Sequence, residues 1–369
     1  MPAQTMTPPP QRVPNLWKNV ALLLVSTLLA CAAIEAGFRL LEKPLGIEII
    51  GRDFDLLRSA FPASYDAELG WVPREGARGR QNVWGTEITI GKHGIRENGP
   101  GGPVRPRPLT LMVGDSFAFG DEVSDHETVP AHLERLAGTR VLNGGVFGYG
   151  IDQTYLRALR LLQTYRPDVL VFSMITADVS RTQLNIRTGA GKPYFAVSGD
   201  GSGMDLRNVP VPRTSRGGLA LRRVIAASHA ASYVVMRLFP EYWMTGMSAG
   251  SHQVHSDGPL ILRLILRSLN ALAAERSMTV VLLIQDYPLP GIEDAYVRAA
   301  VGTIVDMVKE EKLDRLAVVN MYPVLLDIKL RDPAQFAGLL GPRGGHASSE
   351  GNALVAAELL PLVGRPSRR

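Results

Sequence analysis

Hydrophobic positions form one long run near the N-terminus and then a series of short runs separated by amphipathic segments. The long run, residues 20–34 (VALLLVSTLLACAAI), contains no charged side chain, and with its flanks it approaches the roughly 20 residues that span a bilayer. Arg12 and Lys18 precede the run, and Trp17 is placed for the membrane interface. The pattern predicts a single-pass transmembrane anchor over 17–41, with the bulk of the chain outside the cytoplasm.

Two other interpretations of this run stay open at the level of sequence. The run could be a cleaved signal, in which case Leu28–Cys31 (LLAC) is a passable lipoprotein cleavage site and Cys31 would be lipidated. A buried helix of a soluble core is the third reading, and the terminal position of the run argues against it.

The segments around the anchor differ from the rest of the chain in composition. Residues 1–16 are rich in Pro and Gln and predict a disordered tip. Residues 42–108 predict a stalk followed by a β-rich segment, in which residues 86–98 (TEITIGKHGIREN) alternate and then break at Gly94. Residues 99–108 (GPGGPVRPRP) have the composition of a linker, so we expect the main domain to cover 109–364.

Within the main domain, short apolar runs alternate with amphipathic segments of helical period. Strands are expected at 108–115, 140–146, 167–175, 278–287 and 316–325, and helices at 129–138, 151–165, 258–276, 292–312 and 349–363. A polar, glycine-rich insertion near 186–219 interrupts the series. Nearly continuous apolar strands that alternate with helices indicate a parallel sheet covered on both faces. The predicted fold is therefore α/β, a doubly wound parallel sheet of about five strands.

Composition and charge exclude some classes of function. The chain has 369 residues and a net charge of +5, and one cysteine rules out an intrachain disulfide. Much of the basic excess lies near the two ends of the chain, at Arg12, Lys18, Arg39, Lys43, Arg365, Arg368 and Arg369. No basic surface with interleaved aromatic residues is apparent, so we expect no nucleic-acid partner.

Polar clusters follow three of the predicted strands and precede the last helix. They are Asp115-Ser116, Asn143–Gly150, Thr176–Arg181 and Gly344–His346. Because reactive groups of a doubly wound sheet collect at the carboxyl ends of its strands, we expect these clusters to converge in space.

Ser116 and His346 are the candidate reactive pair. A serine hydroxyl becomes a nucleophile only when a base takes its proton, and the reaction also needs N–H groups aimed at the oxyanion that forms. The alternative for Asp115-Ser116 is a helix cap, and the alternative for His346 is a residue at the start of the last helix. His252 and His255 lie close together without a third ligand, so no metal site is expected.

The ordered clusters together resemble the SGNH (GDSL) hydrolase superfamily. The stretch VGDSFAFG resembles its first block, VLNGGVFGYG its second and HASSEGNALVAAEL its last. The resemblance implies that Ser116 is the nucleophile and also lends its amide to the oxyanion hole, that Gly148 is the oxyanion-hole glycine, and that His346 is the general base. IEAGFRLL, YDAELGWVP and GKHGIREN, ahead of the serine, are similar to a membrane-anchored bacterial branch of that superfamily.

Two positions depart from the superfamily pattern. Ala177 stands where an asparagine normally donates to the oxyanion, and Arg343 stands where an aspartate normally orients the histidine. The sequence then leaves another carboxylate, such as Asp332 or Asp327, or a backbone carbonyl to orient His346, and it favours a Ser-His dyad with a weakened oxyanion hole. Asp115 and Asp178 are candidate supporting residues.

For an anchored member, the resemblance implies an envelope ester hydrolase or acyltransferase. Its expected substrate is an acylated carbohydrate or lipid, with O-acetyl groups foremost, and its expected location is the bacterial inner membrane with the catalytic domain in the periplasm or outside. Such a mechanism needs no cofactor. Two alternatives stay open: a non-catalytic member that binds a glycan or an assembly partner, which Ala177 and Arg343 favour, and a cytosolic esterase.

Overall fold

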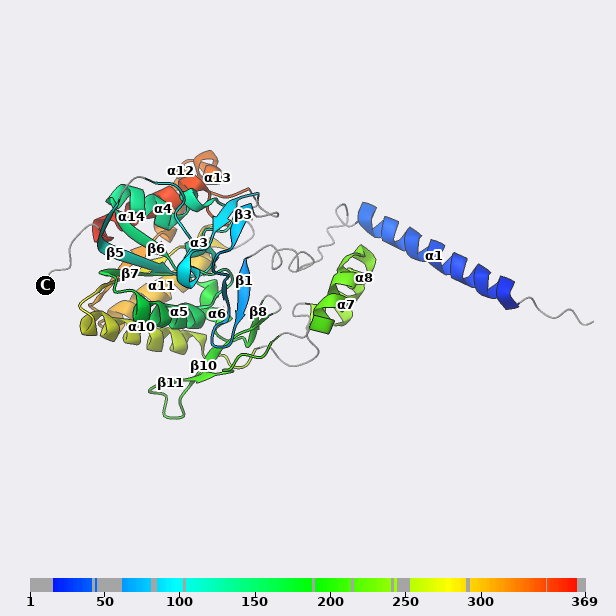
Figure 1. Cartoon of the computed structure of the whole chain (residues 1–369), viewed down its shortest axis with the longest axis horizontal. Helices are drawn as coiled ribbons and strands as arrows, with labels where there is room; N and C mark the ends of the chain where they lie inside the picture. Colours follow the sequence, from blue (N-terminus) through cyan, green and yellow to red (C-terminus); the bar gives the residue numbers. More distant parts are fainter. Residues whose placement is uncertain are drawn as a thin grey trace, which may run out of the picture.

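The structure, a computed structural model, consists of an α/β body, a small helical hairpin and one long N-terminal helix that extends away from both (Figure 1). It describes residues 16–41, 44, 62–80, 85–101, 104–187, 190–213, 216–239, 242–243, 253–289, 293–342 and 344–363. Residues 1–15 of the predicted disordered tip, almost all of the stalk, His252 and Arg343 lie outside these residues, while Leu16, the last residue of the predicted tip, is helical.

The body is built on a five-stranded sheet in which all neighbours are parallel, as the sequence predicts. Its order is β13-β12-β7-β5-β6. The strands are β5 (Arg105–Val113), β6 (Thr139–Asn143), β7 (Val169–Met174), β12 (Thr279–Ile284) and β13 (Leu316–Asn320). Every residue of β7 is buried, which explains why its sequence is nearly continuously apolar.

Helices cover both faces of the sheet, and successive strand residues point into two separate cores. Leu111 of β5 belongs to the core on one face, and its neighbour Met112 belongs to the core on the other. The first core is completed by α5 (Ile151–Thr164), α10 (Gly258–Glu275) and α11 (Asp294–Glu310). The second is completed by α4 (Val129–Ala137), α12 (Tyr322–Arg331), α13 (Pro333–Gly338) and α14 (Ser349–Val363).

Several predicted strand boundaries were wrong, and local chemistry explains two of the differences. The strand expected to reach residue 325 ends at Asn320, because Tyr322 begins α12 and the proline after it fits the first turn of a helix. The second half of the expected Gly/Pro linker is the start of β5, where Arg105 pairs with Thr139 before the register shifts.

The β-rich segment predicted ahead of the sheet forms two hairpins that pack against the body. They consist of β1 (Ala63–Asp66) with β2 (Gly70–Pro73) and β3 (Arg78–Arg80) with β4 (Glu87–Thr89), followed by the short helix η1 (Lys92–Gly94). Trp71 packs on Tyr149, and Arg96 pairs with Asn143 at the end of β6. The segment therefore supports the loop that follows β6.

The glycine-rich insertion contains more structure than the sequence predicts. Its first part holds two hairpins, β8 (Ile186–Arg187) with β9 (Ala190–Gly191) and β10 (Tyr194–Val197) with β11 (Met204–Arg207). The helices α7 (Arg216–Ala226) and α8 (His229–Leu238) follow and had no predicted counterpart. Short helices α3 (Ser116–Phe119), η2 (Asp125–Glu127) and α6 (Ala177–Arg181) complete the described elements.

The long N-terminal helix is α1 (Leu16–Leu41). It is 26 residues long with a mean hydropathy of 2.1 over its most apolar stretch, and none of that stretch is buried. Its length and composition suit a membrane span or a signal sequence.

Candidate active site

The predicted reactive residues gather where the chain order of the sheet reverses. The chain leaves β5 toward β6 on one side and returns to β7 on the other, so the ends of β5 and β7 form the switch point of the fold. Ser116 directly follows this end of β5 as the first residue of α3. Gly114 permits the tight turn, because a Cβ there would lie 2.7 Å from that of Ala118 and 2.9 Å from that of Ser173.

Ser116 and His346 are in hydrogen-bond contact. Ser116 Oγ lies 3.0 Å from His346 Nε2, although the two residues are 230 positions apart in the chain. Asp115 also caps α3 by accepting a hydrogen bond from Phe117 N at 3.0 Å. The capping role and the contact with histidine, weighed as alternatives for this dipeptide, are thus both present.

The residue that orients His346 is Glu122. Its Oε1 lies 3.0 Å from His346 Nδ1. The expectation that Asp332 or Asp327 would act here was wrong: Asp332 caps α13 by accepting from Ala334 N and Gln335 N, and Asp327 pairs with Arg331. The expected dyad is in fact a Ser-His-Glu chain of contacts, with the geometry of a hydrolytic triad.

Glu122 reaches the histidine because the chain doubles back directly after α3. Gly120 adopts a left-handed conformation with φ 91°, and both Gly120 N and Asp121 N donate to Ser116 O. Glu122 itself has φ 70°, which is unusual for a residue with a side chain. A Cβ at Gly341 would lie only 2.8 Å from Glu122 Oε2, so glycine at that position leaves room for the carboxylate.

Arg96 holds this loop from inside the protein. Its side chain is fully buried, and its guanidinium pairs with Asp125 and donates to the carbonyl oxygens of Phe119, Gly120 and Val123. These acceptors flank Glu122 on both sides. Arg96 belongs to GKHGIREN, so that segment contributes to the site through the loop and not by direct contact.

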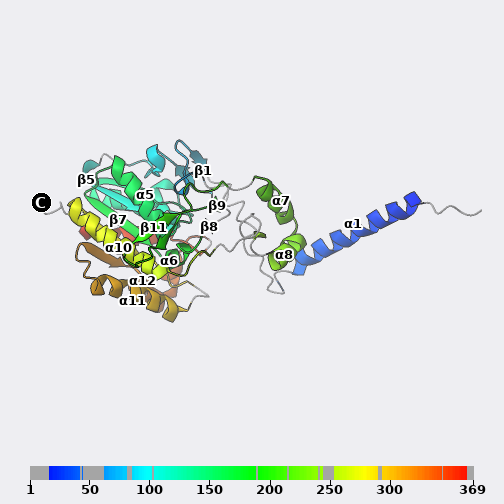
Figure 2. The same ribbon diagram turned by 90° about the horizontal axis from the view of Figure 1, so that it is seen from below.

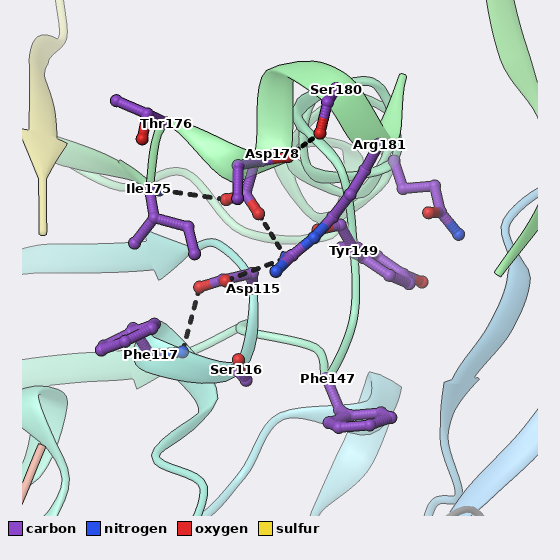
Figure 3. A network of polar contacts seen from close by, with 12 residues as sticks. Asp115, Ser116, Phe117, Phe147, Tyr149, Ile175, Thr176, Asp178, Ser180 and Arg181 are labelled. Atoms are coloured by element: carbon purple, nitrogen blue, oxygen red, sulfur yellow. Dashed lines mark hydrogen bonds and ion pairs between the residues drawn. The ribbon is translucent and has the colours of Figure 1, made fainter. Parts of the chain in front are cut away.

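The loop after β6 carries the glycine assigned to the oxyanion hole. Gly148 has φ 74°, a conformation that favours glycine, and Tyr149 N donates to Val146 O across the turn. A Cβ at Gly145 would lie 2.3 Å from Phe119 N, so glycine there lets this loop pack directly on the backbone of α3. Figure 3 shows Phe147 and Tyr149, the neighbours of Gly148, beside the turn that carries Ser116.

The third cluster forms an ionic network behind the serine (Figure 3). Arg181 Nη1 lies 3.1 Å from Asp115 Oδ2, contacts Asp178 Oδ1, and donates to Tyr149 O at 2.9 Å. Asp178 also accepts from Ile175 N at 3.1 Å. Burial raises the pKa of Asp178 well above its ordinary value against the attraction of Arg181. Asp115 and Asp178 thus support the loops of the site, and neither contacts His346 through a hydrogen bond among the described residues.

Ala177 is the first residue of α6 and is exposed, so the position that carries an asparagine amide in the superfamily presents a methyl group here. Its neighbour Thr176 is fixed by Asp286, which accepts from Thr176 N and from Thr176 Oγ1 at 2.7 Å.

Three acidic groups set the charge state of His346. Burial opposes the imidazolium, but the hydrogen bond to Glu122 and the charges of Asp121, Glu122 and Asp115 outweigh it, so the pKa of His346 is raised. Burial raises the pKa of Asp121 to about 7 despite the attraction of His346 and Arg96. Asp121 Oδ2 lies 4.0 Å from His346 Nε2, and both oxygens of this buried carboxyl lack a hydrogen-bond partner among the described residues.

Sequence reasoning placed Ser116 and His346 but missed Glu122, Asp121 and Arg96. The available signal was the acidic pair that follows Gly120, five and six residues after the candidate nucleophile. Among the residues that the structure describes, no group of three His, Cys, Asp or Glu side chains is placed to hold a metal ion.

Solved structures similar to this chain include several ester-cleaving enzymes. A protein described as a lipolytic member of the G-D-S-L family from Desulfitobacterium hafniense is 14% identical, with a TM-score of 0.39, and the match covers 69% of this chain and 99% of that one. A lipase/acylhydrolase from Enterococcus faecalis is 15% identical, with a TM-score of 0.37 and coverage of 71% and 99%. The resemblance of the chain to the SGNH superfamily is carried by its ordered sequence blocks.

A third match is a catalytic mutant of an acetylxylan esterase from Geobacillus stearothermophilus. It is 15% identical, with a TM-score of 0.39, and covers 73% of this chain and 99% of that one. No family model and no curated protein matches this chain.

Proposed function

We propose that this protein is a serine ester hydrolase or acyltransferase of the SGNH type. The observation that carries the proposal is the chain of contacts from Ser116 Oγ through His346 to Glu122, each 3.0 Å long. A nucleophile, a base and an orienting carboxylate in this order supply the groups that acyl transfer requires.

Each proton has a donor and an acceptor in this arrangement. Ser116 Oγ attacks the acyl carbonyl carbon while His346 Nε2 takes the hydroxyl proton. The tetrahedral intermediate then breaks its bond to the alcohol oxygen, which leaves with the proton from His346, and the acyl group stays on Ser116. Water or a sugar hydroxyl repeats the sequence on the acyl-enzyme, and Glu122 stabilises the imidazolium in both halves.

The developing oxyanion would receive hydrogen bonds from the backbone amides of Ser116 and Gly148. With Ala177 in place of an asparagine, one donor of the superfamily pattern is missing, and loss of one such donor costs about 10²–10³ in rate in other hydrolases. We therefore infer a slower enzyme than a member with the full set.

The substrate that we propose is an acylated carbohydrate or lipid of the bacterial envelope, with O-acetyl groups foremost. An acetylxylan esterase among the structural matches acts on an acetylated polysaccharide by its description, which is compatible with this class. Hydrolysis and transfer proceed through the same acyl-enzyme and differ only in the acceptor of the acyl group, which is water in hydrolysis and a sugar hydroxyl in transfer.

We further propose that α1 is a retained inner-membrane anchor and that the body lies in the periplasm. Contacts between α1 and the folded chain support retention, because Glu35 accepts hydrogen bonds from Ser228 Oγ and His229 N. A signal sequence that is cleaved leaves no such contacts in the mature protein.

The test is covalent labelling of the full-length protein in detergent by a fluorophosphonate, together with turnover of p-nitrophenyl acetate. We expect labelling and turnover in the wild type and neither in Ser116→Ala. Ser202→Ala, on the exposed turn between β10 and β11, is the matched control and should behave as wild type. Labelling that survives in Ser116→Ala would overturn the proposal.

A non-catalytic, glycan-binding member is the second candidate, and the exposed methyl group of Ala177 is the observation that favours it. A wild type that is folded, binds acetylated glycan and resists the fluorophosphonate under all conditions would support this candidate over the enzyme.

A further inference from the structure

The hairpin of α7 and α8 is attached to the end of α1, almost 190 residues away in the chain (Figure 1). Glu35 of α1 accepts hydrogen bonds from Ser228 Oγ at 2.7 Å, His229 N at 3.0 Å and Ala230 N at 3.2 Å. Its carboxylate therefore caps the N-terminus of α8. The Phe38 ring lies 5.3 Å from the ring of Tyr233, and Arg39 Nη2 donates to Ala227 O at 3.3 Å.

These contacts fix the level of the hairpin relative to a bilayer. The uncharged run of α1 ends at Ile34, directly before Glu35. From Lys18 to Glu35, the charged residues that bound this run, the helix rises about 26 Å at about 1.5 Å per residue, close to the roughly 30 Å thickness of the hydrocarbon core. If α1 spans the membrane, Glu35 and Arg39 lie near one head-group layer, and the start of α8 must lie there as well.

Both helices of the hairpin expose apolar side chains at helical spacing. Leu221 and Val224 are three residues apart on α7, and Val234 and Leu238 are four apart on α8, with Phe239 next to them. These five side chains are between 49% and 72% exposed. Short helices that leave several large apolar side chains in solvent are characteristic of segments that lie in a membrane interface.

The charge of the hairpin indicates whether protein or lipid would cover these apolar side chains. Residues 216–239 contain no Asp or Glu and contain four arginines, at 216, 222, 223 and 237. Arg223 and Arg237 are exposed. A second copy of this hairpin would bring like charges together, whereas anionic phospholipid head groups complement them.

We propose that the α7–α8 hairpin is a membrane-surface element. It lies in the head-group layer at the end of α1, inserts the five apolar side chains toward the acyl chains, and places the exposed Arg223 and Arg237 among anionic phosphates. The proposal rests on α1 as a retained anchor, which is part of the proposed function.

This arrangement also determines which side of the body, with the candidate active site, faces the membrane. The strands of the sheet run toward α3 and α6. Figure 1 shows α3 and α6, and Figure 2 shows α6, on the side of the body toward α7, α8 and α1. With the hairpin on the bilayer, Ser116 faces the membrane surface, where acylated lipids and membrane-linked glycans are accessible.

The experiment uses single-cysteine variants of the full-length protein in nanodiscs of phosphatidylcholine and phosphatidylglycerol. On a Cys31→Ser background, an environment-sensitive fluorophore is attached at Leu238→Cys, at Leu24→Cys in α1, or at Leu330→Cys on α12 as the exposed control. Quenching is then measured with lipids that carry a nitroxide near the head group.

We expect blue-shifted emission and several-fold stronger quenching at position 238 than at 330. Arg223→Glu with Arg237→Glu should reduce quenching at 238, and the reduction should be larger with phosphatidylglycerol than with phosphatidylcholine alone.

Quenching at 238 equal to that at 330, while position 24 is quenched, would overturn the hairpin proposal and leave the anchor standing. Blue-shifted emission at 238 without quenching would mean that protein covers the hairpin, which also overturns it. Loss of quenching at 24 would overturn the anchor and the hairpin proposal together. Fluorophosphonate labelling in the same nanodiscs reports on the catalytic proposal independently of these outcomes.

Discussion

Glu122 determines how His346 can act. In the proposed mechanism a neutral imidazole accepts the proton from Ser116, and the carboxylate at Nδ1 stabilises the imidazolium that results. The same carboxylate, with Asp121 and Asp115, raises the pKa of the histidine although burial opposes this. A base with a raised pKa is stronger, but a larger share of it is protonated at neutral pH.

The pH dependence of Glu122→Gln tests this role. In the wild type, kcat/KM should rise with pH through an inflection above the ordinary histidine value, because only neutral His346 acts as base. Removal of the carboxylate charge lowers the pKa of His346, so the inflection should move to lower pH while the plateau falls by about 10²–10⁴. Kinetics of p-nitrophenyl acetate hydrolysis across pH measure both effects.

Glu350→Gln, an exposed change at the start of α14, is the control and should leave the profile unchanged. An unaltered profile in Glu122→Gln would contradict the orienting role.

We expect that a substitution at Ala177 can raise the rate of ester hydrolysis. An asparagine there would restore an amide donor beside the oxyanion, and we expect Ala177→Asn to raise kcat about tenfold, a fraction of what such a donor is worth in other hydrolases. Ala177→Leu has a similar size without a donor and should show no gain. Equal rates in the two variants would mean that a side chain at position 177 does not donate a hydrogen bond to the oxyanion.

At the scale of elements, the turn from β5 into α3 and the loop that follows carry most of the site. Ser116, Asp121 and Glu122 lie within seven consecutive residues, and the left-handed Gly120 reverses the chain between them. The loop has no regular hydrogen-bonding pattern of its own, so Arg96 supplies the donors that its carbonyl groups need.

Arg96→Met should therefore destabilise the protein and the site together. It leaves the buried Asp125 carboxylate without its positive partner and removes the Arg96 donor from the carbonyl oxygens of Gly120 and Val123. Removal of one partner of a buried ion pair costs about 3–5 kcal/mol. Urea denaturation measures the loss. Arg207→Met removes an exposed pair with Asp205 and should cost less than about 1 kcal/mol. Similar stability in the two variants would show that Arg96 is not a structural support of the loop.

At the scale of the whole molecule, topology brings the site together. The strand order β13-β12-β7-β5-β6 sets the ends of β5, β6 and β7 side by side, so clusters that are distant in sequence share one edge. The same edge lies on the side of the body toward α1 and the α7–α8 hairpin (Figure 2). If α1 is the anchor that we propose, this edge of the body faces the membrane.

The sequence by itself determined the sheet, the long apolar helix and the pair Ser116–His346. Apolar runs such as 169–172 are visible because a strand buried on both faces is nearly continuously apolar, and the short blocks around Ser116 and His346 stand in a recognisable order.

Only the tertiary structure decided which carboxylate serves His346. That choice depends on a left-handed turn at Gly120, on space beside Gly341 and on a buried arginine from a distant segment, none of which has a local sequence signal. The α7–α8 hairpin was missed for a related reason: its apolar residues are not buried in the body, and their role becomes visible only once Glu35 of α1 is seen to cap α8.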